Sequence, residues 1–273
     1  MSDLYAVFGN PIAHSKSPQI HAMFAAQCGQ DIDYQKRLAP LDGFAASIQA
    51  FIAEGGRGAN VTVPFKEQAF ALAQHLSQAA QCARAVNTLR FTAHGIEADN
   101  TDGAGLVRDL KQAGQTLQGK RILLLGAGGA ARGALLPLLQ EGPALVHIAN
   151  RSLPRAQALA QDFASLAQPG QLDASALHAA SALAQQPWDL IINATSSSLQ
   201  EQGMDLPDAL FAHTMLAYDM VYGSALTPFL QQAQAQGVAV RDGLGMLVQQ
   251  AALAFAWWRG VLPDTGPVYA ALR

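Results

Sequence analysis

A glycine-rich turn between an apolar run and a helical segment constrains the fold of this chain more than any other feature. Residues 122–125 read Ile-Leu-Leu-Leu and are followed at once by Gly126-Ala127-Gly128-Gly129-Ala130-Ala131. A short, wholly apolar run is typical of a strand that is buried on both faces of a parallel sheet, and residues 130–139 are predicted to form a helix. The sequence therefore predicts a strand, a tight glycine turn and a helix.

This strand-turn-helix arrangement is the one that a dinucleotide-binding turn requires. Gly126 suits the tight turn, Gly128 lets the backbone approach a pyrophosphate, and small Ala131 permits close packing of helix on strand. The helix N-terminus then presents free N–H groups to the phosphates. The predicted cofactor-binding residues of the turn are Gly126, Ala127, Gly128, Gly129 and Ala130. A purely structural glycine turn is the alternative.

The end of the next predicted strand, residues 145–149, indicates which dinucleotide is bound. An NAD enzyme usually places Asp or Glu about 20 residues after the glycines, where it accepts a hydrogen bond from the ribose 2′-hydroxyl. Here the strand runs into Asn150-Arg151-Ser152, without a carboxylate. Arg151 and Ser152 can bind a 2′-phosphate, and Arg155 adds positive charge one turn further on. We therefore predict an NADP site; the alternative is that both arginines are solvated at the start of a helix.

Composition excludes several other classes of protein. With 273 residues, half of them hydrophobic, the chain is long enough for two domains with cores of their own. A net charge of -3 and a pI near 6.1 argue against binding to nucleic acid or to an anionic membrane. No signal peptide or membrane-spanning run is recognisable, so we expect a cytoplasmic protein. Cys28 and Cys82 lack metal-ligand spacing, and we predict no metal site.

Alternating strands and helices predict two α/β units. The first is expected to contain strands at 5–8, 33–38 and 59–63, a hairpin at 86–91 and 96–99, and helices starting at Ser17 and Asp42. The second is expected to continue from the glycine turn with strands at 145–149, 190–193, 216–219 and 238–240 in a parallel sheet. A last helix, 245–259, is apolar almost all round and is expected to be buried.

Two polar clusters could supply a proton to a substrate that accepts a hydride from the nicotinamide. Strand alternation places Asn60 and Thr62 on one face, and Pro64 ends the strand, so Lys66 follows its carboxyl end, where α/β sheets bind ligands. Asp102 could hold the Lys66 ammonium in place and modulate its acidity. The alternatives are a solvated lysine and an aspartate that only caps the following helix.

Hydroxyl and amide side chains provide candidates for substrate binding. Ser15 and Ser17 stand in a loop before the predicted helix, where hydroxyl donors and the helix dipole suit a carboxylate. Ser17 could equally be the N-cap of that helix. Asn87 and Thr88 form another polar pair, within the strand predicted at 86–91.

Ten motifs, in chain order and spread over nearly the whole sequence, resemble those of the shikimate dehydrogenases of aromatic biosynthesis. They read HSKSP, NVTVPFK, AVNTL, DNTDG, GAGGAARG, NRS, NATSSS, YDMVYG, TPFL and DGLGMLVQQAA. The resemblance implies an oxidoreductase of aromatic amino acid biosynthesis that reversibly reduces 3-dehydroshikimate to shikimate with NADPH. It also implies an α/β fold in two domains separated by a cleft: a substrate domain, residues 1–101 with the C-terminal helices 245–273 packed on it, and a doubly wound Rossmann-type NADP domain, residues 102–244.

The same resemblance implies roles for individual residues. Lys66 would be the acid-base residue and Asp102 its partner. The implied substrate-binding residues are Ser15, Ser17, Thr62, Lys66, Asn87, Asp102, Tyr222 and Gln250. Beyond the glycine turn, the implied cofactor-binding residues are Asn150, Arg151, Ser152, Arg155, Met220 and Gly243. Thr195 and Ser196 would line the cofactor groove or form a turn after a strand. Gln78 departs from the family, which commonly has an acidic residue there.

Two other functions stay open at this point. A quinate/shikimate dehydrogenase of broader specificity shares the scaffold and differs in details of the pocket. A non-catalytic nucleotide-binding regulatory module is the other alternative, because fold alone does not determine function. Such a module should lack Lys66 or Asp102, and both are present. We expect the protein to bind a small-molecule substrate. We also expect it to be a monomer or a homodimer.

Overall fold

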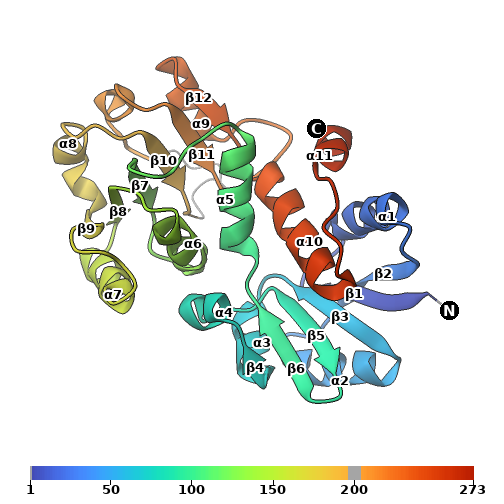
Figure 1. Ribbon diagram of the computed structural model, residues 1–273. Helices are drawn as coiled ribbons and strands as arrows, with labels where there is room; N and C mark the ends of the chain where they lie inside the picture. The colour runs from blue at the N-terminus through green and yellow to red at the C-terminus, as the bar shows by residue number, and fades with distance from the viewer. Residues whose placement is uncertain (1, 196–203) are drawn as a thin grey trace. The chain divides into compact units, whose positions relative to one another are not determined.

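The computed structural model describes residues 2–195 and 204–273, which form two compact units (Figure 1). Unit 1 comprises Met1–Gly105 and Leu247–Arg273, and unit 2 comprises Leu106–Met246. The chain passes from one unit to the other within helix α5 (Asp102–Gln112) and again within helix α10 (Leu244–Arg259). Which ligand each unit binds stays a prediction.

Unit 1 is built on a six-stranded mixed sheet. Its order is β2-β1-β3-β5-β6-β4, in which β5 runs antiparallel to its neighbours β3 and β6 and the other neighbouring pairs are parallel. The strands are β1 (Asp3–Gly9), β2 (Ile32–Leu38), β3 (Gly56–Val61), β4 (His75–Leu76), β5 (Thr88–Thr92) and β6 (Gly95–Asp99). The expected hairpin is β5 and β6. Asn87 lies just before β5, so the prediction that it stands inside the strand is wrong.

Two helices of unit 1 begin within two residues of their predicted starts, Ser17 and Asp42. The helices of this unit are α1 (Ser17–Cys28), α2 (Phe44–Ala53), α3 (Lys66–Leu72), α4 (Gln78–Ala83) and α11 (Gly266–Leu272), with the adjoining parts of α5 and α10. Gly29 ends α1 in the left-handed conformation, at φ 61°. Lys16 occupies the N-cap and Ser17 is already helical, so Ser17 is not the cap of this helix. Its hydroxyl is therefore available for another role.

Two apolar clusters stabilise unit 1. Phe8, Phe44, Phe51 and Phe65 pack between the sheet and α2 and α3, with Phe44 stacked on Phe65. A second cluster joins α1 to the C-terminal helices: Ile20, Phe24, Val248, Phe255 and Val268 are all buried in it. The C-terminal part of α10 thus belongs to the core of unit 1.

Unit 2 contains a six-stranded sheet in which every pair of neighbouring strands is parallel. The strands are β7 (Arg121–Leu125), β8 (Leu145–Asn150), β9 (Leu172–Ala176), β10 (Leu190–Asn193), β11 (Leu216–Asp219) and β12 (Ala239–Arg241). Their order, β12-β11-β10-β7-β8-β9, is that of a dinucleotide-binding sheet, with the strand order reversing direction beside β7. The predicted α/β class and parallel sheet are confirmed; β9 was not predicted.

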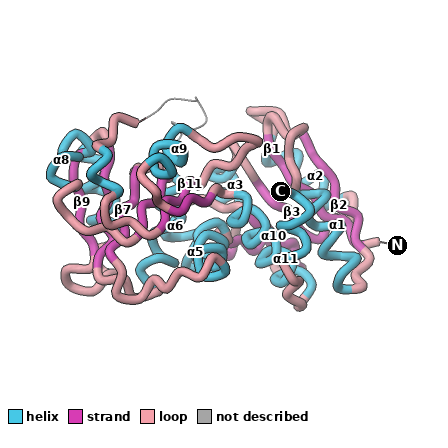
Figure 2. Tube along the Cα trace, turned by 90° about the horizontal axis from the view of Figure 1, so that it is seen from above, coloured by secondary structure: helices cyan, strands magenta, loops and turns pink. Residues whose placement is uncertain are grey.

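Helices cover both faces of this sheet (Figure 2). On one face, Leu123, Ile191 and Ala217 pack against Trp188 and Phe229. Alternate residues such as Ile122 and Leu124 point to the other face and are equally buried. The helices are α6 (Gly129–Gln140), α7 (Leu153–Phe163), α8 (Ala180–Leu183) and α9 (Pro228–Ala235), with short 3₁₀ turns at Leu177–Ala179 and Asp208–Phe211. Burial on both faces explains why the central strands β7 and β10 are largely apolar.

Candidate active site

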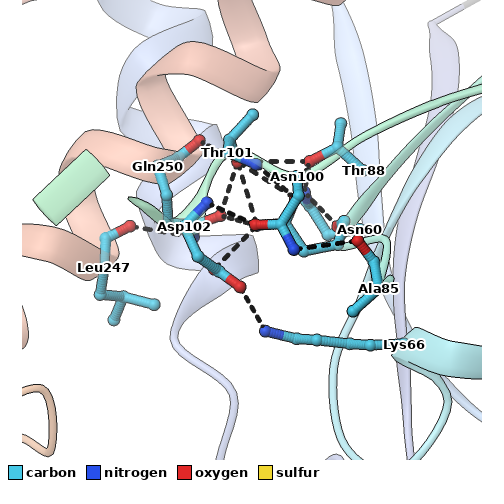
Figure 3. Close-up of polar contacts among 10 residues, drawn as sticks. Asn60, Lys66, Ala85, Thr88, Asn100, Thr101, Asp102, Leu247 and Gln250 are labelled. Carbon is cyan, nitrogen blue, oxygen red and sulfur yellow. Dashed lines mark hydrogen bonds and ion pairs between the residues drawn. The ribbon is translucent and has the colours of Figure 1, made fainter. Parts of the chain in front are cut away.

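Lys66 and Asp102 meet in unit 1, as the sequence predicted. Lys66 is the first residue of α3, just beyond the carboxyl end of β3, and Asp102 is the first residue of α5, shortly after β6. The Lys66 ammonium Nζ lies 2.6 Å from Oδ2 of Asp102 (Figure 3). Both side chains are partly exposed, at 30% and 22% of their surface. An ammonium held by a carboxylate and still open to its surroundings is suited to exchanging a proton with a bound substrate.

The side-chain amide of Asn87 has one fixed orientation. The backbone N–H of Thr101 donates to its Oδ1 at 2.9 Å, and a backbone N–H cannot accept. The amino group of Asn87 is therefore directed toward Asp102, to whose Oδ1 it donates at 2.8 Å. Both oxygens of the Asp102 carboxylate thus accept hydrogen bonds, one from Lys66 and one from Asn87.

Gln250, on α10, joins the same network. Its Oε1 accepts from Nδ2 of Asn87 at 3.2 Å, and its backbone carbonyl accepts from the Thr101 hydroxyl at 3.2 Å. A Cβ added to Gly105 would lie 2.8 Å from the Gln250 backbone nitrogen, so only glycine permits this approach of α5 to α10. The structure therefore brings Asn87, Asp102 and Gln250 together, although 163 positions separate the first and last.

Sequence reasoning named Thr88 and Asn60 but assigned them no role, and it did not single out Tyr34. The amide Nδ2 of Asn60 donates to the Thr88 hydroxyl at 3.1 Å, and that hydroxyl donates to Oδ1 of Asn87 at 2.9 Å. The Tyr34 hydroxyl in turn donates to Oδ1 of Asn60 at 2.7 Å. This buried chain of hydrogen bonds leads from β2 to the Asp102 carboxylate, and only the polar alternation of Asn60 and Thr62 hinted at it.

His21 lies beside this chain of hydrogen bonds and has no exposed surface. Its ring stacks on that of Tyr34, with centroids 4.2 Å apart and planes 7° apart. Neither ring nitrogen has a hydrogen-bond partner among the described residues. Burial lowers the pKa of His21 to about 3, and the nearby Asn60 side chain acts in the opposite direction with a smaller effect. The imidazole is therefore neutral at physiological pH.

The two serines of the loop before α1 form a pair. The Ser15 hydroxyl lies 3.2 Å from the Ser17 hydroxyl and also accepts from the Ser17 backbone N–H. Ser17 is buried. Burial raises the pKa of the Tyr34 phenol, and the nearby Ser17 side chain partly opposes that rise. Thr62, directly after β3, is half-buried, and its methyl group fills the space that a side chain at Gly9 would need.

The glycine turn of unit 2 lies at the carboxyl end of β7, where the strand order reverses. Gly126 has φ of 109°, which other residues rarely adopt, and Thr195 and Ala194 lie just over 3 Å from a Cβ placed on it. Gly128 and Gly129 face open space, and Gly128 is the N-cap of α6. The backbone is therefore accessible at the helix N-terminus, as a bound pyrophosphate requires.

The end of β8 carries two exposed arginines. Arg151 and Arg155 are exposed, and neither pairs with an acidic side chain among the described residues. Ser152 is the N-cap of α7, but its side chain makes no capping hydrogen bond. Asn150 donates to the Ser152 carbonyl at 3.0 Å, which fixes the turn that presents Arg151. These groups suit the 2′-phosphate of NADP.

Met220 and Gly243 lie against each other in unit 2. The Gly243 backbone N–H donates to the Val221 carbonyl at 3.1 Å, and a Cβ on Gly243 would overlap the Met220 carbonyl oxygen. Tyr222 follows in the same segment, and burial raises the pKa of its phenol, which keeps its proton. Contact of Tyr222 with the substrate stays a prediction.

Three remaining sequence predictions concern positions outside these networks. Both the hydroxyl and the backbone N–H of Thr195 donate to Oδ1 of Asn193, at 2.7 and 3.0 Å, which is a local turn after β10. Ser196 lies outside the described residues. Gln78 is exposed at the start of α4.

The part of the chain that the structure describes contains neither a cluster of metal ligands nor a helix that could span a membrane. There, no three His, Cys, Asp or Glu side chains gather as metal ligands would. No helix in the same residues is long and apolar enough to cross a membrane.

Comparisons with known proteins agree over both units. The family model described as shikimate dehydrogenase substrate binding domain matches residues 7–89, and that described as shikimate / quinate 5-dehydrogenase matches residues 109–202. A third, described as shikimate 5'-dehydrogenase C-terminal domain, matches residues 243–273. Together these matches span most of the chain.

Individual relatives match from end to end. The shikimate dehydrogenase (NADP(+)) of Dechloromonas aromatica strain RCB is 58% identical, over 100% of this chain and 98% of its own. The crystal structure of an Ael1 enzyme from Pseudomonas putida has a TM-score of 0.94 at 48% identity, covering 99% of this chain and 98% of that one. Shikimate 5-dehydrogenase from Thermus thermophilus, in complex with NADP(H) and shikimate, has a TM-score of 0.86 at 36% identity, with 98% of each chain covered.

Proposed function

Because this chain belongs to the shikimate dehydrogenase family, we propose that it catalyses the reversible NADPH-dependent reduction of 3-dehydroshikimate to shikimate, with Lys66 and Asp102 as the acid-base pair. The protein is thus an NADP-dependent oxidoreductase. The observation that carries the assignment of the pair is the 2.6 Å contact between Nζ of Lys66 and Oδ2 of Asp102.

The chemistry of the reduction assigns a distinct task to each member of the pair. NADPH supplies the hydride that adds to the carbonyl carbon. Negative charge then develops on the carbonyl oxygen, and the Lys66 ammonium donates a proton to that oxygen, leaving a neutral amine. In the oxidation direction the neutral amine accepts the hydroxyl proton. The Asp102 carboxylate holds Nζ in place in both directions, because Asn87 fixes its other oxygen.

The remaining polar side chains of unit 1 are assigned to substrate recognition. Ser15 and Ser17 bind the substrate carboxylate, which is supported by their paired hydroxyls and by the absence of a capping role for Ser17. Thr62, Asn87, Asp102 and Gln250 are assigned to the ring and its hydroxyls, and the resemblance to the family implies a further substrate contact for Tyr222. Asn87 and Gln250 are buried at 2% and 9% exposure, so their amides are already oriented before substrate binds.

The residues of unit 2 fit NADP. The open backbone of Gly126, Ala127, Gly128, Gly129 and Ala130 would bind the pyrophosphate. The 2′-phosphate and adenosine would be bound by Asn150, Arg151, Ser152 and Arg155, and the nicotinamide end would lie along Met220 and Gly243. Two exposed arginines, which pair with no acidic side chain among residues 2–195 and 204–273, support the choice of NADP over NAD.

A quinate/shikimate dehydrogenase of broader specificity is the second candidate, because the family model that matches residues 109–202 includes quinate enzymes in its description. The test is the initial rate of reduced-cofactor formation with shikimate or quinate, each with NADP or NAD. We expect a strong preference for shikimate with NADP. Comparable rates with quinate would favour the broader enzyme, and no rate with any pair would contradict dehydrogenase activity.

The acid-base assignment is tested by Lys66→Ala. We expect kcat to fall by a factor of about 100 or more, the usual contribution of a positioned acid or base, while binding of NADPH is retained. Lys111→Ala is the matched control, because it removes a lysine that pairs with Glu141 at 2.7 Å on the surface of unit 2. Equal activity of the two variants would contradict the role of Lys66.

A cytoplasmic location and a monomeric or homodimeric state complete the proposal. Both were predicted from the sequence. Cell fractionation tests the first, and sedimentation at several protein concentrations tests the second.

A further inference from the structure

The carboxylate of Asp109, on α5, is fully buried in unit 2. It accepts hydrogen bonds from Nε of Arg241 at 2.8 Å and from a terminal nitrogen of the same guanidinium at 2.5 Å. The Tyr218 hydroxyl donates to it at 2.8 Å. Burial, and then the Asp109 charge, raise the pKa of Tyr218, so this phenol keeps the proton that it donates. Asp109 thus accepts three hydrogen bonds from side chains of two different strands.

These donors lie at the ends of the strands that lead to the proposed nicotinamide site. Tyr218 is in β11, two positions before Met220, and Arg241 ends β12, two positions before Gly243. The two strands are neighbours, with Tyr218 paired to Arg241 in register. One carboxylate therefore fixes both strand ends immediately before the segments that carry Met220 and Gly243.

Close backbone packing makes these segments sensitive to the position of Asp109. A Cβ on Gly245 would overlap the Asp109 carboxylate, just as one on Gly243 would overlap the Met220 carbonyl oxygen. Neither Gly243 nor Gly245 has room for a side chain, because Met220 and Asp109 fill that space. A change at the carboxylate is therefore expected to move the backbone beside Met220.

Stability alone does not account for a buried ion pair. Removing two charges from water costs several kcal/mol per ion, and well-packed apolar residues often stabilise a fold equally well. What a bidentate guanidinium-carboxylate pair adds is fixed geometry.

We propose that Asp109 is a positioning residue for the nicotinamide end of NADP: through Tyr218 and Arg241 it fixes the two backbone segments that carry Met220 and Gly243. This inference rests on the proposed function, which places the nicotinamide beside those residues. The expected effect of Asp109 is limited to the nicotinamide half of NADP, because the groups assigned to the adenosine end lie after β8.

The test compares two ligands that share the adenosine end. NADPH occupies the whole site, whereas adenosine 2′,5′-bisphosphate carries only the 2′-phosphate half. For Tyr218→Phe, which removes one hydroxyl and keeps the ring, we expect the Kd of NADPH to rise about 10-fold while that of the bisphosphate is unchanged. Asp109→Asn is expected to act in the same direction and more strongly, and to lower kcat with little change in the KM of shikimate.

Trp188→Phe is the control for general damage to unit 2. Trp188 is buried in the core of the unit, and its indole N–H donates to the Leu183 carbonyl at 2.8 Å, far along the chain from the Asp109 cluster. We expect this variant to lose stability without changing the ratio of the two affinities. Equal weakening of both ligands by Tyr218→Phe, or no weakening of NADPH, would overturn the inference. Failure of the unsubstituted protein to bind either ligand would overturn the proposed function, and this inference with it.

Discussion

The buried imidazole of His21 makes the stability of unit 1 depend on pH. Its pKa is about 3 in the folded protein, against 6.5 for an unperturbed histidine. Between these values the unfolded chain binds a proton that the folded chain does not, so folding stability falls as pH falls through this window. Well above pH 6.5 the imidazole is neutral in both states, and His21 then no longer lowers folding stability.

The size of the effect follows from the two pKa values. At pH 5 the protonated form of the unfolded histidine outnumbers the neutral form about 30-fold. Protonation therefore stabilises the unfolded state by RT ln 33, or about 2 kcal/mol. At pH 7.5 the same contribution is below about 0.1 kcal/mol. We therefore expect His21 alone to cost unit 1 about 2 kcal/mol between pH 7.5 and pH 5.

The measurement is urea unfolding of the parent protein and of His21→Phe across this pH range. Phenylalanine keeps an aromatic ring on Tyr34 and cannot titrate. Both proteins would carry Trp188→Phe, so that the fluorescence of Trp257 and Trp258 reports on unit 1, which has both of the remaining tryptophans. Subtracting the two curves removes other titrations, including that of His147, whose pKa burial also lowers.

Between pH 7.5 and pH 5 the parent is expected to lose about 2 kcal/mol more than His21→Phe, whatever the offset between the two at pH 7.5. Parallel curves would refute the reasoning. They would mean that the imidazole is protonated in the folded protein or is already exposed to water.

Three further substitutions test other parts of the structure. Arg151→Ala is expected to raise the Kd of NADP about 10-fold or more while changing that of NAD little, since only NADP has a 2′-phosphate; equal losses in binding assays would contradict the assignment. Thr88→Val should destabilise unit 1 by about 1–3 kcal/mol in urea unfolding, because it removes the buried hydroxyl that donates to Asn87, and Thr88→Ser should restore most of this. Gly105→Ala should lower stability by about 1–3 kcal/mol through overlap with Gln250, and an unchanged melting temperature would show that α10 can shift.

Local sequence signals predicted most of the secondary structure and the class of fold. The apolar run of β7 and the glycines after it predicted the strand, the turn and the start of α6 within a residue or two. β9 was missed because Leu-Asp-Ala-Ser-Ala is neither apolar nor regularly alternating, and β4 because it has only two residues. Short or polar strands form because a neighbouring strand offers backbone hydrogen bonds. A local sequence pattern contains no information on that neighbour.

The candidate site was predicted unevenly. Lys66 and Asp102 stand in polar motifs beside strand ends; the residues left their contact as one alternative, and the resemblance to the family implied it. Ser17 shows the limit of such reasoning: its sequence position is that of an N-cap, and the structure places the cap one residue earlier, at Lys16. Packing can move the start of a helix by one residue. A shift of that size decides whether the Ser17 side chain caps the helix or is left for another role.

The sequence by itself determined the α/β class, the parallel sheet of unit 2 and the glycine turn, because periodicity, glycine and proline act over a few residues. Only the tertiary structure decided which polar groups meet. Arg241 and Asp109 are 132 positions apart, and Asn87 and Gln250 are 163 apart. Hydrogen bonds of this kind depend on where whole strands and helices pack, so no local pattern specifies them. Folding is what converts an ordinary threonine, an asparagine and an aspartate into a fixed set of donors and acceptors.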